Sequence, residues 1–193
     1  ADTPGVKILR KQQTMMDDQP CEMAFDDVRV PLTNLVGTEG EGFRMAQTWI
    51  TMGRIRHGAI ALGTMERCLE LGASYAKARV TFGKPLSERQ SIQWMLVDTY
   101  ADLHMVRLMI YSAAAKYDAG EDIRWESYMC KYIGDRKGFE SADRCMQMYG
   151  GMGLTTDLPI EKLWRDARSF MITEGPEEIL KHVLQRHVLN QYG

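Results

Sequence analysis

The stretch IQWMLVDTYADLHMVRLMIYSAAAKYDAG, residues 92–120, decides the fold of this chain. Its apolar side chains recur at the spacing of one helix face, and the pattern stops near Gly120. The residues of this face are Ile92, Leu96, Tyr100, Leu103, Ile110, Ala114 and Tyr117. A helix with an apolar face needs partners to bury it. The neighbouring segments therefore determine the rest of the fold.

The segments on either side also have a helical period. Long helices are expected at about 41–79 and 125–149, and shorter ones at 159–170 and 176–190. Three long and two short helices with short connections predict a mainly α fold, an antiparallel helical bundle over residues 39–193. The side chains expected in its core are Leu96, Leu103, Ile110, Met129, Ile133 and Met146.

The first 38 residues have a different pattern. Short strands are indicated at Val6–Leu9 and Cys21–Phe25, and prolines at positions 4, 20 and 31 interrupt the segment. Two or three strands do not form a stable sheet on their own. A short β segment is therefore expected to precede the helices.

Composition narrows the classes of function. The chain has 193 residues, 45% of them hydrophobic and 26% charged, with a formal net charge of −2. This balance is that of an ordinary globular protein, and it gives no electrostatic basis for binding nucleic acid. No apolar run approaches the roughly 18–20 residues of a membrane-spanning helix.

The spacing of cysteines and histidines argues against a disulfide framework or a metal site. The cysteines are scattered with no CxxC pair, which favours reduced packing residues in an intracellular protein. They are Cys21, Cys68, Cys130 and Cys145. The histidines have no metal-ligand spacing, and all four are interpreted as structural or solvated. They are His57, His104, His182 and His187.

The segment RDARSFMITEGPEEI, residues 165–179, contains the strongest candidate for chemistry. Glu174 ends an apolar run and precedes a helix start, in which Gly175 is a fair N-cap and Pro176 suits the first helical position. A connection between two helices can aim a side chain at a ligand. The alternative is that Glu174 is an ordinary acidic residue at a helix N-terminus, where such residues are common.

The segment RVTFGKPL, residues 79–86, followed by Gln90, lies where a helix is expected to end. Arg79 can donate two hydrogen bonds to phosphate oxygens, and an exposed Phe82 can stack on a flat ring. In the alternative, Arg79 complements the helix dipole and Phe82 returns to the core.

The segment QMYGGMGL, residues 147–154, is a glycine-rich helix exit. Gly150 and Gly151 would let a cofactor approach the backbone closely, although a helix cap followed by a turn is the commoner role. The chain has no GxGxxG fingerprint between a strand and a helix and no GK[ST] loop. A nicotinamide-binding Rossmann domain is therefore excluded.

In this order, these three segments resemble the C-terminal part of the acyl-CoA dehydrogenases. The segments FDDVRVP (25–31) and GTEGEGF (37–43) resemble the exit from that family's middle β domain. Arg54, twenty-five positions before Arg79, falls where the family has an arginine beside its acyl-CoA pocket. The resemblance covers nearly the whole chain. It implies that residues 1–38 are the last strands of a truncated middle β domain and that the chain is a fragment.

The resemblance implies an FAD-dependent acyl-CoA dehydrogenase, which performs α,β-dehydrogenation of an acyl-CoA thioester in fatty acid metabolism. Glu174 corresponds to the family's catalytic base, and Arg54 and Gly175 correspond to substrate-binding positions. The implied cofactor is FAD. The residues implied to contact it are Arg79, Thr81, Phe82, Gln90, Gln147, Gly150 and Gly151.

The resemblance also implies partners and a compartment. In the family, the arginine segment and the glycine-rich loop reach the FAD of a neighbouring subunit, which implies a homodimer or homotetramer. Electron-transfer flavoprotein is the implied electron acceptor. The implied location is a bacterial cytoplasm or a mitochondrial matrix.

Two positions depart from the family pattern. Pro176 replaces a threonine whose hydroxyl contacts the cofactor, and Thr173 replaces a common aromatic residue before the base. Some branches place the base beside the position of Arg54, but Met52-Gly53 offers no carboxylate there. The alternatives are an acyl-CoA oxidase, a nitroalkane oxidase, which uses Asp as the base, and a non-catalytic helical fragment that only oligomerises. The isolated chain is expected to be inactive or nearly so.

Overall fold

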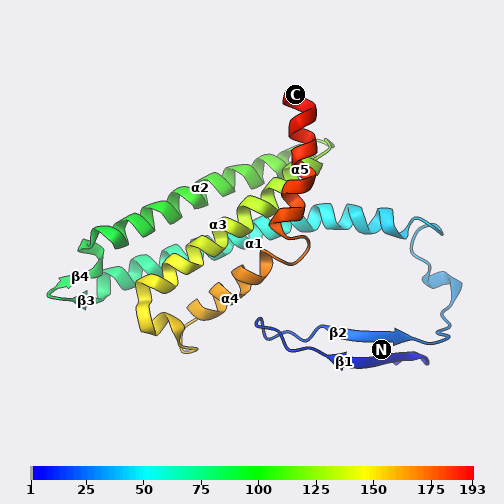
Figure 1. Cartoon of the computed structure of the whole chain (residues 1–193), viewed down its shortest axis with the longest axis horizontal. Coiled ribbons are helices and arrows are strands. Elements are labelled where there is room, and N and C mark those ends of the chain that lie inside the picture. Colours follow the sequence, from blue (N-terminus) through cyan, green and yellow to red (C-terminus); the bar gives the residue numbers. More distant parts are fainter. Residues whose placement is uncertain (1) are drawn as a thin grey trace. The chain divides into compact units, whose positions relative to one another are not determined.

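The computed structural model describes residues 2–193. The α-helices of the described chain are α1 (Gly42–Ala78), α2 (Gln90–Asp118), α3 (Arg124–Tyr149), α4 (Ile160–Phe170) and α5 (Glu177–Tyr192), shown in Figure 1. The strands pair two by two: β1 (Val6–Lys11) with β2 (Cys21–Phe25), and β3 (Val80–Thr81) with β4 (Lys84–Pro85). Short 3₁₀ helices lie in the connections: η1 (Leu32–Asn34), η2 (Leu86–Glu88) and η3 (Gly150–Leu154).

The predicted mainly α fold is confirmed, and the helices begin and end close to the predicted residues. One boundary is corrected by a single residue: Pro176 is the N-cap of α5 and Glu177 is its first residue, where the sequence had indicated Gly175 as the cap. The extended φ and ψ of Pro176 suit a cap position better than a helical one. Within residues 2–193, no helix is both long enough and apolar enough to cross a membrane.

Contacts divide the chain into two compact units, one that ends at Trp49 and one that comprises Ile50–Gly193. In the first unit, β1 and β2 form an antiparallel ladder that pairs Val6 with Phe25. The side chains of Ile8 and Phe25 are largely exposed. This two-stranded ladder therefore buries no core of its own, as expected for so few strands.

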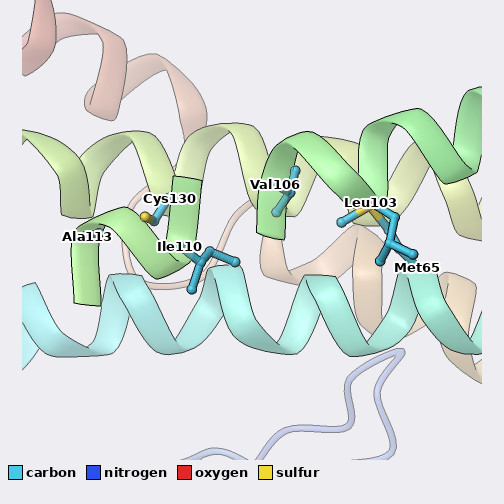
Figure 2. Packing of buried hydrophobic residues seen from close by; sticks show 6 residues of the cluster. All are labelled: Met65, Leu103, Val106, Ile110, Ala113 and Cys130. Atoms are coloured by element: carbon cyan, nitrogen blue, oxygen red, sulfur yellow. The ribbon is translucent and has the colours of Figure 1, made fainter. Parts of the chain in front are cut away.

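In the second unit, the core lies between α1, α2 and α3. Figure 2 shows its first cluster of buried side chains, Met65, Leu103, Val106, Ile110, Ala113 and Cys130. A second cluster joins α1 and α3 to α4 and consists of Cys68, Ala142, Cys145, Met148, Ile160 and Ala167. Full burial of a leucine- or methionine-sized side chain stabilises a fold by roughly 1.5–3 kcal/mol. The two clusters are therefore the main force that holds α1 and α4 against α3.

The predicted core is confirmed in part, because Leu96, Met129, Ile133 and Met146 are only half-buried. Leu103 and Ile110 are buried, but Tyr100 and Tyr117, which were expected on the same face, are exposed. The reason is that α2 is apolar on two faces, and the spacing alone does not tell which of them is covered. We call the exposed face the outer stripe of α2. It consists of Trp94, Val97, Tyr100, Met105, Leu108 and Tyr111.

Small residues let α1 and α3 approach each other closely. A Cβ built on Gly134 of α3 would lie 2.9 Å from the Cα of Gly58 of α1. No side chain fits between the two backbones at this point. The residue next to Gly58 therefore faces α3 directly, and this packing sets His57 of α1 beside Asp135 of α3.

Candidate active site around Glu174

Glu174 lies in the connection between α4 and α5, as the sequence predicted. Its φ of 54° is in the left-handed region, and Gly175 follows with a φ of 108°. A left-handed φ is uncommon for a residue other than glycine, and such residues cluster at functional sites. The backbone N–H of Thr173 donates to the carbonyl of Ser169 at 3.1 Å, so the end of α4 fixes the start of this turn.

The two carboxylate oxygens of Glu174 have different surroundings. Oε1 accepts a hydrogen bond from Nη2 of Arg56 at 3.0 Å and lies 3.4 Å from Nε2 of His57. Oε2 is buried and has no hydrogen-bond partner among the described residues. A buried carboxylate oxygen without a donor is rare in folded proteins. One oxygen is thus anchored, and the other keeps its lone pairs available.

Gly53 makes room for the unpaired oxygen. It lies on α1 one turn before Arg56, and a Cβ built on it would come within 2.6 Å of Oε2 of Glu174. Such a contact is shorter than van der Waals distance, so any side chain at position 53 would displace the carboxylate. The close approach of Glu174 to α1 therefore depends on a glycine at this point.

A row of buried charged groups continues from Glu174 into the protein. The ring of His57 faces Glu174 with Nε2 and Asp135 with Nδ1, which lies 3.4 Å from Oδ2 of Asp135. Nζ of Lys131 donates to the same Oδ2 at 2.8 Å and to the carbonyl of Phe170 at 2.9 Å. The side chains of His57, Asp135 and Lys131 are 6%, 3% and 1% exposed. Buried ionisable groups persist when they are paired in this way.

Arg54 occupies the next position on α1 after Gly53. Its guanidinium lies over the ring of Tyr128, 4.1 Å from the ring centroid, and its Nε is buried without a hydrogen-bond partner in the described chain. The cation–π contact fixes the direction of the side chain. Arg54 and Glu174 therefore flank the same point of α1.

Glu177, the first residue of α5, fastens the helix that follows Glu174. Its carboxylate accepts a hydrogen bond from Nε of Arg136 on α3 at 2.7 Å and pairs with Lys181 one turn along α5. Burial by itself raises the pKa of Glu177, but the hydrogen bonds from Lys181 and Arg136 hold this pKa below its usual value. Glu178, its neighbour, is exposed. Glu177 therefore links α5 to α3 in addition to being an N-terminal acidic residue.

The segment that was expected to contact a cofactor forms a tight hairpin after α1. Phe82 and Gly83 connect β3 to β4 with φ values of 49° and 75°, as a two-residue hairpin turn requires. The ring of Phe82 is 99% exposed, so the alternative in which it returns to the core is wrong. Arg79 is also exposed, and Nη2 of Arg89 fixes the hairpin by donating to the carbonyl of Thr81 at 2.6 Å.

The glycine-rich exit of α3 leaves its backbone open. Gly150 has a φ of 57°, and a Cβ built on Gly150 or Gly151 would meet no atom within 4 Å. The side chains of Gln147 and Gln90 are both exposed. Nothing in the described chain occupies the space beside these residues.

The hairpin and the glycine-rich exit leave the same end of the bundle, because Tyr75 near the end of α1 stacks on Tyr149 at the end of α3 with 3.9 Å between ring centroids. Glu174 meets α1 far from there, at Gly53. Gly53 and Ala78 are 25 positions apart, which corresponds to roughly 38 Å of α-helix. The structure therefore does not bring all the predicted site residues together but separates them into two groups (Figure 1).

The sequence did not reveal the residues that surround Glu174. His57 was interpreted as structural or solvated, and Lys131 and Asp135 were not singled out. One signal was present: Lys131 and Asp135 are four residues apart, the spacing of an ion pair on a helix. Whether such a pair lies on the surface or inside the protein depends on burial, and the sequence of α3 does not show which of its residues are buried.

Comparison with known proteins agrees with this architecture. Residues 40–189 match the family described as "Acyl-CoA dehydrogenase, C-terminal domain". The chain therefore belongs to the acyl-CoA dehydrogenase family, as the resemblance of its motifs had indicated.

Three relatives illustrate the similarity. Acryloyl-CoA reductase (NADH) of Anaerotignum propionicum is 36% identical over 191 residues, which are 98% of this chain and 48% of that protein. The structure of butyryl-CoA dehydrogenase from Megasphaera elsdenii has a TM-score of 0.89 and 33% identity, over 97% of this chain and 50% of that one. The structure of PigA with FAD and proline has a TM-score of 0.90 and 25% identity, over 98% of this chain and 50% of that one. The chain spans about half the length of these relatives.

Proposed function

We propose that this chain is the C-terminal part of an FAD-dependent acyl-CoA dehydrogenase in which Glu174 removes the α-proton of an acyl-CoA thioester. The observation that carries the proposal is the asymmetry of the Glu174 carboxylate. Oε1 is held by Arg56 and faces His57, whereas Oε2 is buried and has no donor among the described residues. A general base needs this arrangement, because an oxygen that already accepts hydrogen bonds has fewer lone pairs available for a proton.

In the proposed reaction, Oε2 of Glu174 accepts the proton from the α-carbon of the thioester. A bound FAD would supply the acceptor for the hydride of the β-carbon, and the acyl group would become an α,β-unsaturated thioester. The protein positions the base and limits its contact with water, since the Glu174 side chain is only 24% exposed. Exclusion of water strengthens the electrostatic interactions within such a site.

The residues at the far end of the bundle fit a flavin nucleotide in their chemistry. The exposed guanidinium of Arg79 can hold a pyrophosphate, and the exposed ring of Phe82 can stack against a flat ring. The open backbone at Gly150 and Gly151 allows close approach of a ligand. We assign the adjacent Thr81, Gln90 and Gln147 to the same role.

The separation of the two groups along α1 supports a homodimer or homotetramer. Roughly 38 Å of α1 separates Gly53, which Glu174 contacts, from the hairpin, whereas groups that react with each other must come within about 3–3.5 Å. We therefore assign Arg79 and Phe82 to the FAD that serves the Glu174 of a neighbouring copy. The outer stripe of α2, which begins beside the hairpin, is the surface we assign to the contact between copies, because contiguous exposed apolar side chains mark interaction sites.

The substrate-side assignments are Arg54 and Gly175, which flank Glu174 on α1 and in the loop. We propose electron-transfer flavoprotein as the oxidant of the reduced enzyme. An acyl-CoA oxidase would instead pass the electrons to oxygen. The reaction of the reduced protein with air, compared with its reaction with electron-transfer flavoprotein, distinguishes these two functions.

The test is anaerobic mixing of the natural full-length protein with a series of acyl-CoA thioesters, followed by the absorbance of oxidised flavin. We expect the flavin absorbance to bleach within seconds for at least one chain length. A protein that binds FAD but is bleached by none of the thioesters would contradict the proposed reaction. A protein that contains no flavin would contradict the assignment of FAD.

A further inference from the structure

We infer that His57 is a positioning residue for the proposed base: it fixes the orientation of the Glu174 carboxylate, and Asp135 and Lys131 in turn fix His57. This inference rests on the proposed role of Glu174. It concerns three residues that the sequence did not mark as functional.

Two side chains, Arg56 and His57, lie beside Oε1 of Glu174 and differ in how deeply they are buried. Arg56 donates to Oε1 at 3.0 Å, but its side chain is 52% exposed, so water competes for its guanidinium. His57 lies 3.4 Å from Oε1 and is only 6% exposed. A buried ring with two rotatable bonds holds a direction better than a half-exposed arginine. His57 therefore sets the direction in which Oε2 points.

The ring of His57 is itself held on three sides. Asp135 faces Nδ1 at 3.4 Å, on the opposite side of the ring from Glu174. The ring of Phe170 packs edge-on against it, with 5.2 Å between centroids and an interplanar angle of 84°. The close packing of Gly58 against Gly134 fixes the backbone next to it. These contacts restrict rotation of the ring away from Glu174.

Lys131 connects this ring to the loop that carries Glu174. Its ammonium donates to Asp135 at 2.8 Å and to the carbonyl of Phe170 at 2.9 Å. Phe170 is the last residue of α4, four residues before Glu174. The buried ammonium of Lys131 thus holds both Asp135, which faces His57, and the end of α4, where the Glu174 loop starts.

The row that orients the base ends inside the protein. The charged groups that face His57 are Glu174 from the loop and Asp135 from α3. Behind Asp135 the row ends at Lys131, whose side chain is 1% exposed and already donates to two acceptors.

The test compares His57→Phe, His57→Gln and Asp135→Asn with the wild type in the natural full-length protein. His57→Phe keeps a ring but removes the ring nitrogen that lies 3.4 Å from Oε1. We expect flavin reduction by acyl-CoA to slow by roughly 10- to 100-fold, because small misplacements of a catalytic group have effects of that size. KM should stay within about threefold, since the substrate contacts are unchanged.

The pH profile provides a readout that a purely structural role would not change. Removing the imidazole nitrogen beside Oε1 changes the surroundings of the proposed base, so the pH–rate profile of His57→Phe should differ from that of the wild type. His57→Gln should recover part of the rate, because its amide N–H can still donate. Asp135→Asn keeps the shape of the side chain and should fall between His57→Phe and the wild type.

The matched control is Asp102→Asn. Asp102 is also buried and paired with two cations, Arg144 and Lys137, but it lies on α2 and does not contact Glu174. This variant should lose stability and keep the rate and the pH profile. If His57→Phe does not fold, the flavin-reduction rates and pH profiles of His57→Gln and Asp135→Asn test the inference instead.

The outcomes separate this inference from the proposed function. If Glu174→Gln still reduces flavin at the wild-type rate, the base is wrongly assigned, and the role of His57 fails with it. If Glu174→Gln is inactive while the folded His57 and Asp135 variants match the wild type in rate and pH profile, Glu174 stands and the positioning role is refuted.

Discussion

Gly53 and Glu174 are in direct steric contact across the surface of α1: a Cβ on Gly53 would lie 2.6 Å from Oε2 of Glu174. Because Oε2 is the end of a flexible side chain, Gly53→Ala should leave the fold intact and push the carboxylate away from its site. We expect flavin reduction by acyl-CoA to fall by roughly 100-fold, as for other displaced catalytic groups. Stopped-flow absorbance of the flavin measures this rate.

Gly63→Ala is the control for this substitution. Gly63 lies on the same helix, and a Cβ there would meet no atom within 4 Å. Alanine is the better helix former, so Gly63→Ala should stabilise the protein by up to about 1 kcal/mol and keep its rate. Equal rates for the two variants would show that the space at Gly53 is irrelevant to the base.

Glu177 should contribute stability that depends on pH. Its folded-state pKa lies below the usual value: burial opposes this shift, but the hydrogen bonds from Lys181 and Arg136 outweigh burial. A depressed pKa stabilises the fold above the unfolded pKa near 4.5, and the contribution is lost as the pH falls through the folded value. Glu177→Gln should therefore lower stability at pH 7 by roughly 1 kcal/mol, since Arg136 and Lys181 are half exposed to solvent.

Chemical denaturation between pH 3 and about pH 7 measures the effect of this substitution. The difference between the wild type and Glu177→Gln should shrink toward acid pH. Glu178→Gln is the control, because Glu178 is exposed and should change stability little at any pH. A difference that stays constant down to the lowest pH would contradict the role of the carboxylate charge.

The outer stripe of α2 should be the contact between copies of this protein. A charge in its middle, Leu108→Asp, would have to be buried without a partner in the assembled form. We expect sedimentation velocity to show a shift to smaller species. Gln13→Asp adds the same charge at an exposed loop position and should leave the assembly unchanged. Identical sedimentation of both variants and the wild type would place the contact elsewhere.

The helices were predictable because their signals are local. The period of the apolar residues, together with Gly120 and Gly150, determined where α2 and α3 end. Which of the two apolar faces of α2 is buried could not be predicted from this period. Leu103 and Tyr100 are one turn apart and both apolar, yet the first is buried and the second is exposed. Only the packing of α1 and α3 distinguishes them.

The candidate site was predictable where a motif marks it and not where three-dimensional packing creates it. Glu174 stands just before a helix start, which Gly175 and Pro176 mark in the sequence. His57 is 117 positions from Glu174 in the sequence and becomes its neighbour because the connection between α4 and α5 packs against α1 at Gly53. The distance between Glu174 and the hairpin likewise follows from the length of α1 and not from any local pattern.

The central claim is that Glu174 is the base, and Glu174→Gln tests it most directly. The amide keeps the shape of the side chain and removes its basicity, so FAD and acyl-CoA should still bind. The rate of anaerobic flavin bleaching by acyl-CoA should fall by on the order of 10²–10⁴-fold or more, the range that a positioned base contributes. Bleaching within about tenfold of the wild-type rate, well short of that range, would contradict the account.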